Sequence, residues 1–260
     1  MEFVADILYD LPKNYGHVFD LVHFILCIQG ERSDMTEEEL KVLPKKHPFA
    51  LWLSSMMICF AGGILLGPLA GESALDAMED GSKILMATLV WYLLFYVEPA
   101  FELSKRFAVK VPLYILKGMY YPKKILAGIR FAKKEFKRNL FALILIPVVK
   151  GNGSGFMKPF ARAVRLSGSI SKGIETISPS LTTKYVFLAT LVNVLVPGDL
   201  AYIGSVGALI AMKAGPLFGL NVAKPFELAN EKVFPKIFGG EETVSEEHTA
   251  PEEEEKSKED

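Results

Sequence analysis

The chain has 260 residues, half of them hydrophobic, and a mean hydropathy of +0.27. Its charge is divided: residues 241–260 carry ten acidic residues and two lysines, so residues 1–240 hold 27 basic and 20 acidic residues, a net charge of +7. The two cysteines, Cys27 and Cys59, lie in apolar segments, which excludes a disulfide scaffold and a multi-cysteine metal site. Because the positive charge alternates with long apolar segments, we do not expect nucleic acid as a partner.

Several segments have the length and polarity of membrane spans. Residues 48–71 contain no charged side chain, and about 20 apolar residues suffice for a helix to cross a bilayer. Residues 84–97 and 185–196 lack the polar side chains at every third or fourth position that a helix on a soluble protein shows. We therefore predict an all-α integral membrane protein with seven transmembrane helices. Their expected ranges are 16–30, 48–70, 84–101, 110–131, 139–157, 184–198 and 200–220.

The ends of the chain differ from its body. The first ten residues have no basic segment followed by a cleavage signal, so a removable signal peptide is not expected. Residues 239–260 are acidic and almost without aromatic side chains, a composition typical of disorder. We predict a transmembrane domain over residues 1–238 and a disordered tail over residues 239–260.

Glycines interrupt the second and the fifth predicted helix. They are Gly62 and Gly63 in the second helix, and Gly151, Gly153 and Gly155 in the fifth. The two helices are equivalent if the chain is two groups of three helices plus one, and an odd number of spans per group inverts the second group. Matching breaks in inverted repeats indicate a permeation or binding site. Close helix packing through small residues is the alternative.

A stripe of lysines marks the fourth predicted helix. Lys110, Lys117 and Lys124 recur every seven residues, and Tyr114 and Tyr121 lie on the same face. A lysine near the bilayer centre costs about 2.5–3.5 kcal/mol on insertion scales. We therefore expect these lysines, and Lys150 beside the glycines of the fifth helix, to face a water-filled path or an anionic lipid headgroup. Snorkelling of their ammonium groups to a membrane interface is the alternative.

Four segments resemble the trimeric intracellular cation (TRIC) channel family of animals, with matching spacing over residues 47–207. They are His47-Pro-Phe-Ala-Leu-Trp-Leu-Ser-Ser-Met, Ile84-Leu-Met-Ala-Thr-Leu-Val-Trp-Tyr-Leu, Lys124-Ile-Leu-Ala-Gly-Ile and Val149-Lys-Gly-Asn-Gly. The resemblance implies an inverted three-plus-three repeat plus one helix, with glycine-broken second and fifth helices. It also implies a homotrimer with a pore in each protomer. Such channels pass potassium and other monovalent cations as counter-current to calcium release. They lie in the endoplasmic or sarcoplasmic reticulum membrane and nuclear envelope, with a cytosolic C-terminus.

The resemblance also implies a bound phosphatidylinositol 4,5-bisphosphate. Lys117 matches the lysine of a Lys-x-x-x-Arg element whose arginine is Tyr121 here, and Lys150 begins a Lys-Gly-x-Gly element. Lysine is a point-charge partner of phosphate, and backbone N–H groups freed at a glycine break add donors. The expected lipid-binding residues are Lys117, Tyr121, Lys124, Gly128, Lys150, Gly151 and Gly153. The expected pore or hinge residues are Gly62, Gly63, Lys150, Gly151, Gly153 and Gly155.

The expected mechanism is electrostatic. Lys117, Lys124 and Lys150 would converge beside the pore, where the lipid offsets charge that otherwise repels cations. Luminal calcium favours closure in the resembled family. The acidic segment with Glu72, Asp76, Glu79 and Asp80 is either a contact for that calcium or a solvated loop.

The same sequence bears on three other functional classes. The four histidines form no H-E-x-x-H pair, and no Ser/His/Asp set is readable, so we do not expect an enzyme. A secondary transporter with the same inverted repeat remains an alternative, although such proteins place coupling carboxylates at the midplane. A non-conducting, lipid-binding membrane scaffold is the other alternative.

Overall fold

The computed structural model describes residues 2–137, 139–166 and 174–232, and the regular secondary structure in this part of the chain is helical. The longer helices are α1 (Glu2–Asn14), α2 (Gly16–Asp34), α3 (Glu37–Lys46), α4 (Pro48–Cys59), α5 (Ala61–Leu66), α6 (Gly81–Tyr96), α7 (Glu98–Lys105), α8 (Phe107–Glu135), α9 (Leu140–Val164), α10 (Leu181–Leu195), α11 (Asp199–Ala214) and α12 (Lys224–Lys232). Short 3-10 helices lie at Pro68–Ala70, Ala74–Met78 and Gly215–Phe218. The acidic tail, predicted to be disordered, lies outside the described residues.

The chain divides into two compact units, residues 1–222 and 223–260. In the first unit, each of the seven ranges predicted from sequence contains helix. Two helical segments, Leu140–Val164 and Asp199–Phe218, are individually long and apolar enough to cross a membrane. Up to four segments qualify if each of two bent helix pairs counts as one span. In the second unit, the described residues contain α12.

The helices differ from the expected ranges at several points. The range 84–101 is two helices, α6 and α7, bent by 97°, because Pro99 lacks the N–H needed to continue the hydrogen bonds of α6. The last predicted helix ends at Ala214 and continues as a short 3-10 helix. The sequence did not predict α3, α12 or α1. Helix α1 is fixed to α11, since the rings of Tyr9 and Tyr202 stack 4.0 Å apart and the Tyr202 hydroxyl donates to the Leu8 carbonyl.

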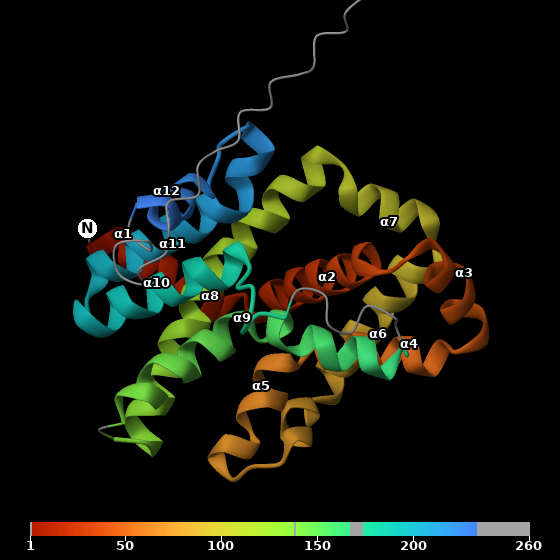
Figure 1. The fold of residues 1–260 in the computed structure, drawn as a ribbon, viewed down its shortest axis with the longest axis horizontal. Coiled ribbons are helices and arrows are strands. Elements are labelled where there is room, and N and C mark those ends of the chain that lie inside the picture. The colour runs from red at the N-terminus through yellow and green to blue at the C-terminus, as the bar shows by residue number, and fades with distance from the viewer. Residues whose placement is uncertain (1, 138, 167–173, 233–260) are drawn as a thin grey trace, which may run out of the picture. The chain divides into compact units, whose positions relative to one another are not determined.

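Three clusters of buried apolar side chains hold the first unit together. One joins α2, α4 and α6, a second joins α8, α10 and α11, and a third lies among α5, α8 and α9. Helix α8 packs along both α9 and α11, and α4 and α5 pack against α9 (Figure 1). Thus α9 connects the helices of the first cluster to those of the second.

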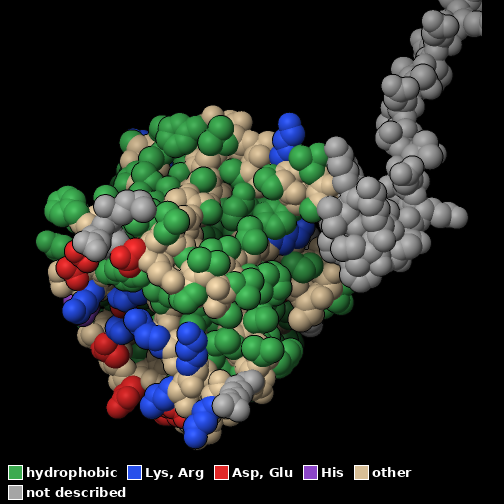
Figure 2. Space-filling model, turned by 90° about the vertical axis from the view of Figure 1, so that its left-hand side faces the viewer, with side chains coloured by type: hydrophobic (Ala, Val, Ile, Leu, Met, Phe, Trp, Pro, Cys, Tyr) green, Lys and Arg blue, Asp and Glu red, His purple; other side chains and the backbone are tan. Residues whose placement is uncertain are grey.

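The surface of the protein is partly apolar. On the face drawn in Figure 2, hydrophobic side chains cover a broad area, whereas charged side chains gather toward one edge. Exposed apolar side chains of α10 and α11 include Leu188, Val192, Leu195 and Leu200. A soluble monomer rarely exposes so continuous an apolar surface, which suits helices that contact lipid.

Both helices expected to carry glycine breaks are broken, but the first break lies at Phe60, so that Gly62 and Gly63 are inside α5. The pair α4–α5 bends by 71°, and α9 leaves helical geometry at Asn152, with φ −116° and ψ 34°. The breaks also meet in space, because a Cβ added at Gly153 would lie 2.7 Å from the backbone nitrogen of Gly62. The missing side chains therefore permit close contact between two backbones.

Candidate functional site

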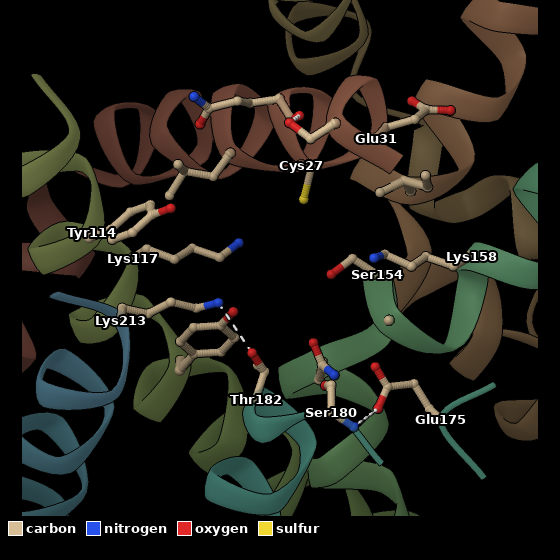
Figure 3. A pocket seen from close by; sticks show the side chains of 18 of the residues that line it. Cys27, Glu31, Tyr114, Lys117, Ser154, Lys158, Glu175, Ser180, Thr182 and Lys213 are labelled. Carbon is tan, nitrogen blue, oxygen red and sulfur yellow. Dashed lines mark hydrogen bonds between the residues drawn. The ribbon is translucent and has the colours of Figure 1, made fainter. Parts of the chain in front are cut away.

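A cavity of about 470 Å³ lies among α2, α8, α9 and α11, close to the break in α9. Its polar lining side chains include Glu31, Lys105, Lys110, Tyr114, Lys117, Tyr121, Asn152, Ser154, Lys158, Glu175, Ser180, Thr182 and Lys213. In Figure 3, Lys117 and Lys213 point into this space from one side, and Ser154 and Lys158 approach from the other. The cavity is therefore polar and rich in ammonium groups.

The α8 stripe predicted from sequence spacing lines one wall of this cavity. The Lys110 ammonium lies 5.4 Å from the ring centroid of Tyr114, and that of Lys117 lies 5.3 Å from Tyr121. Sequence analysis missed Lys213 of α11, whose ammonium lies 5.6 Å from the Tyr121 ring and donates to the Thr182 hydroxyl at 3.2 Å. Aromatic faces attract cations, so Tyr121 is a common neighbour of two lysines.

His23 connects Lys117 with Lys124. Its Nε2 lies 3.0 Å from the Cys59 carbonyl oxygen, to which it donates, so Nδ1 is left to accept from the Lys117 ammonium. The Lys124 ammonium lies 3.2 Å from Nε2. Lys124 therefore belongs to this histidine cluster beside the cavity. The sequence did not predict this contact, because it depends on the packing of α2 against α8.

Lys150 does not join Lys117 and Lys124. Its ammonium lies 5.6 Å from the ring of Phe131, which follows Lys117 by 14 residues on α8, or about 21 Å of helix. The expected convergence of three lysines is therefore not what the structure shows. The reason is the break at Asn152: Lys150 precedes it and faces the C-terminal half of α8, whereas Ser154 and Lys158 follow it and face the cavity.

The remaining predicted glycines occupy tight contacts. A Cβ added at Gly128 would lie 2.6 Å from Cα of Pro147, one at Gly151 would lie 2.6 Å from a Val186 methyl group, and one at Gly63 would lie 2.5 Å from Cβ of Ala77. Real side chains do not approach so closely without displacement. Gly155 is the one predicted glycine among the residues that line the cavity.

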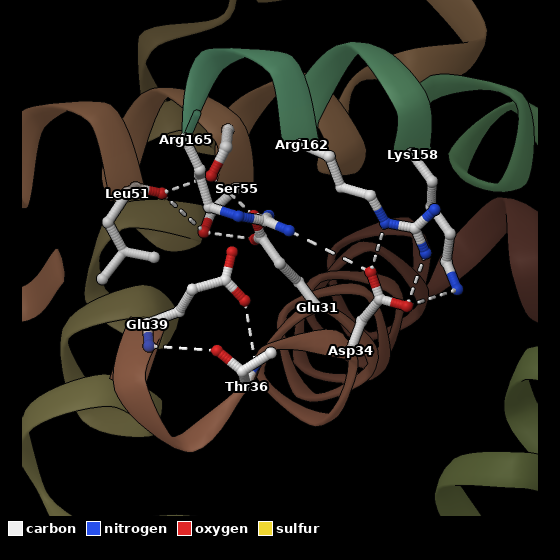
Figure 4. Close-up of polar contacts among 10 residues, drawn as sticks. Glu31, Asp34, Thr36, Glu39, Leu51, Ser55, Lys158, Arg162 and Arg165 are labelled. Carbon is white, nitrogen blue, oxygen red and sulfur yellow. Dashed lines mark hydrogen bonds and ion pairs between the residues drawn. The ribbon is translucent and has the colours of Figure 1, made fainter. Parts of the chain in front are cut away.

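An ionic network fastens α9 to α2 beside the cavity (Figure 4). Arg162 makes two hydrogen bonds to Asp34, at 2.8 and 2.7 Å, and Arg165 pairs with Glu31. Glu31 also accepts hydrogen bonds from the hydroxyls of Ser54 and Ser55 on α4, at 2.6 and 2.5 Å. Sequence analysis missed this network. The available signal was the matching three-residue spacing of the two acids and the two arginines.

The acidic segment before α6 supplies helix caps. Asp76 accepts from the Ser73 N–H at 3.1 Å. Asp80 accepts from the Ser82 N–H at 3.0 Å and hydroxyl at 2.6 Å, which holds the pKa of Asp80 below its ordinary value. Glu72 and Glu79 are exposed. Among the described residues, no group of three or more His, Cys, Asp or Glu side chains is placed to hold a metal ion.

The comparisons with known proteins agree on one family. The family model described as TRIC channel matches residues 38–212. Trimeric intracellular cation channel type 1B.2 of Caenorhabditis elegans is 34% identical over 209 residues, covering 76% of this chain and 66% of the relative. The nematode type 1B.1 is 31% identical, covering 85% and 77%. The human type A channel is 33% identical over 150 residues, covering 57% of this chain and 49% of the relative, so the match spans about half of that protein.

Solved structures agree with the sequence comparisons. The structure of a trimeric intracellular cation channel from C. elegans in the absence of Ca²⁺ superimposes with a TM-score of 0.70 at 33% identity, covering 84% of this chain and 98% of that one. A structure of a C. elegans channel with bound Ca²⁺ gives a TM-score of 0.69 at 28% identity, covering 82% and 98%.

Proposed function

Because the chain belongs to the TRIC channel family, a family of membrane-spanning channels and not of enzymes, we propose that it conducts monovalent cations, chiefly potassium, through a pore in each protomer. The observation that carries this proposal is the polar cavity beside the break in α9. Within a membrane-spanning bundle, freed backbone and charged side chains are stable where they face protein or a water-filled space. The current would balance charge during calcium release from reticulum stores.

The proposed architecture is an inverted repeat of three spans plus a seventh. The first group is α2, α4–α5 and α6–α7, the second is α8, α9 and α10, and α11 is the seventh span. Two observations support this architecture. The broken pair α4–α5 of the first group contacts the broken helix α9 of the second group. In addition, one apolar cluster joins helices of the first group and a separate cluster joins α8, α10 and α11. In such repeats the site lies between the equivalent broken helices.

An anionic lipid is part of the proposal, because five lysines line the cavity. Ammonium groups in a low-dielectric space repel cations unless an anion offsets them. We assign this role to the headgroup of phosphatidylinositol 4,5-bisphosphate, bound by Lys117 with Lys110, Lys158 and Lys213, and beside Tyr121. Lys124 lies next to His23, beside the proposed headgroup site. The separation of Lys150 from Lys117 favours a role for Lys150, Gly151 and Gly153 at the hinge rather than at the headgroup.

Family membership also supports proposals on assembly, location and regulation. The relatives are named trimeric and intracellular, which supports a homotrimer in the endoplasmic or sarcoplasmic reticulum and nuclear envelope, with a cytosolic C-terminus. The nematode structure with bound Ca²⁺ supports calcium as a luminal regulator of this chain as well. The exposed Glu72 and Glu79 are the candidates in the acidic segment whose carboxylates are not used as helix caps.

A flux assay tests the proposal against its alternatives. Purified protein would be reconstituted into liposomes loaded with potassium chloride, with and without phosphatidylinositol 4,5-bisphosphate, and potassium efflux followed under a clamped membrane potential. A channel gives steady efflux driven by the potential alone. A secondary transporter needs a coupled ion gradient, and a scaffold binds the lipid without flux. Either of the last two results would replace the proposed function.

A further inference from the structure

Glu175 is a buried carboxylate on the cavity wall, in the segment that precedes α10. Its Oε2 accepts hydrogen bonds from the Ser180 N–H at 2.8 Å and from the Thr183 hydroxyl at 2.6 Å. Thr183 in turn accepts from the amide of Asn152 at 2.6 Å. The carboxylate is therefore fixed to the residue at which α9 breaks.

The second oxygen of this carboxylate lies beside Gly155, another residue of the cavity lining. Among the described residues, none donates a hydrogen bond to Oε1 of Glu175. This oxygen lies against Gly155, since a Cβ added there would be 2.6 Å from it. In Figure 3, a dashed line joins one oxygen of Glu175 to the Ser180 nitrogen, and no dashed line reaches the other oxygen. The absence of a side chain at residue 155 thus leaves space for a carboxylate oxygen at the break.

The other described carboxylate of the cavity and two of its five described lysines have charged partners. Glu31, the second carboxylate among the described lining residues, pairs with Arg165 and accepts from two serines. Lys105 pairs with Glu102 at 2.6 Å, and Lys158 lies 3.9 Å from Asp34. Among the described lining residues, Glu175 is therefore the carboxylate that has an oxygen available to contact a permeating ion.

We propose that Glu175 is the residue that contacts the permeating cation in the cavity and sets the preference for cations over anions. The hydroxyls of Ser154 and Ser180 line the same space and can complete the oxygen coordination. This inference rests on the proposed channel function. Glu175 supplies negative charge from the protein itself to a cavity lined by lysines, in addition to the charge of any bound lipid.

The composition of the site favours a monovalent ion. Calcium sites gather six to eight oxygens, usually with several carboxylates, whereas here one carboxylate stands among neutral hydroxyl and amide oxygens. Conduction also requires binding that is weak enough to permit release. A single carboxylate with neutral oxygens meets that requirement better than a cluster of acids.

The test is single-channel recording of Glu175→Gln in a potassium chloride gradient, beside wild type. Glutamine keeps an oxygen acceptor for Ser180 and Thr183 and removes the charge. We expect potassium conductance to fall about threefold or more, because a charged wall concentrates counter-ions, and the reversal potential to shift toward that of chloride. Glu175→Asp, which keeps the charge, should retain wild-type cation preference. Glu37→Gln removes an exposed carboxylate on α3 and should change neither value.

Gly155→Ala provides a second variant that retains the carboxylate. Its Cβ would displace Oε1, so conductance should fall in the same direction even if Glu175→Gln fails to fold. Unchanged conductance and reversal potential in folded Glu175→Gln, with a conducting wild type, would overturn this inference and leave the channel function standing. A folded wild type that carries no current would overturn both.

Discussion

Arg165, which follows the last residue of α9, pairs with Glu31 on α2 where both side chains are almost fully enclosed, with exposed fractions of 1% and 0%. Two serines of α4 complete the coordination of the carboxylate. The C-terminal end of α9 is thus joined to α2 and α4, which lie more than 100 residues earlier in the chain, at one buried charge beside the cavity. A buried ion pair is weak evidence for net stability, but removal of one partner leaves an uncompensated charge.

Arg165→Ala should therefore destabilise the protein by about 3–5 kcal/mol. The measurement is thermal unfolding of the purified protein in detergent. Arg106→Ala, which removes an exposed arginine, is the matched control and should unfold like wild type. The double variant Glu31→Gln/Arg165→Gln should lose less than the sum of its single variants, since the two groups interact directly. An unchanged midpoint for Arg165→Ala would contradict this account of the network.

Gly153→Ala tests the contact between the two helix breaks. Its Cβ would collide with the backbone of Gly62, and overpacking of this kind costs about 1–3 kcal/mol. Gly207→Ala on α11 meets nothing within 4 Å and should gain up to about 1 kcal/mol from helix propensity. Opposite shifts of the two unfolding midpoints are expected. Equal shifts would show that the breaks do not pack as described.

Lys117 and Lys150 should affect lipid binding differently. Lys117→Gln should weaken binding of phosphatidylinositol 4,5-bisphosphate about tenfold, since one charge-assisted hydrogen bond is worth at least about 1.5 kcal/mol. Lys150→Gln should leave the affinity unchanged and alter gating, because its ammonium faces the other half of α8. Competition with a fluorescent lipid analogue in micelles measures the affinity. Equal losses in both variants would place Lys150 at the headgroup after all.

A substitution at Gly128 distinguishes a role of this residue in helix packing from a role in lipid binding. Gly128→Ala directs a methyl group at Pro147 and should lower the unfolding midpoint, with lipid affinity of the folded protein unchanged. The same competition assay, performed after size-exclusion chromatography, measures that affinity. A selective loss of lipid affinity without destabilisation would favour the assignment of Gly128 to the lipid site that the sequence resemblance implied.

Local patterns in the sequence predicted much of the fold. Apolar runs located the principal helices, and the seven-residue spacing placed Lys110 and Lys117 on a common wall with two tyrosines. Paired glycines located the broken helices. These signals depend on residues near one another in the chain, where helix periodicity fixes their relative positions.

The cavity itself could not be predicted in the same way. Glu175 and Lys213 belong to segments that meet α8 and α9 through tertiary packing, and neither lies in a recognisable motif. The separation of Lys150 from Lys117 likewise depends on the direction that α9 takes after Asn152. The sharp bend between α6 and α7 was missed because residues 84–101 are apolar enough to suggest one continuous span.

The most direct test of the central claim is planar-bilayer recording of the wild-type protein in a potassium chloride gradient with phosphatidylinositol 4,5-bisphosphate present. We expect discrete unitary currents that reverse near the potassium equilibrium potential. Currents that reverse near the chloride potential, or silent bilayers in which folded protein is shown to be inserted, would contradict a cation channel.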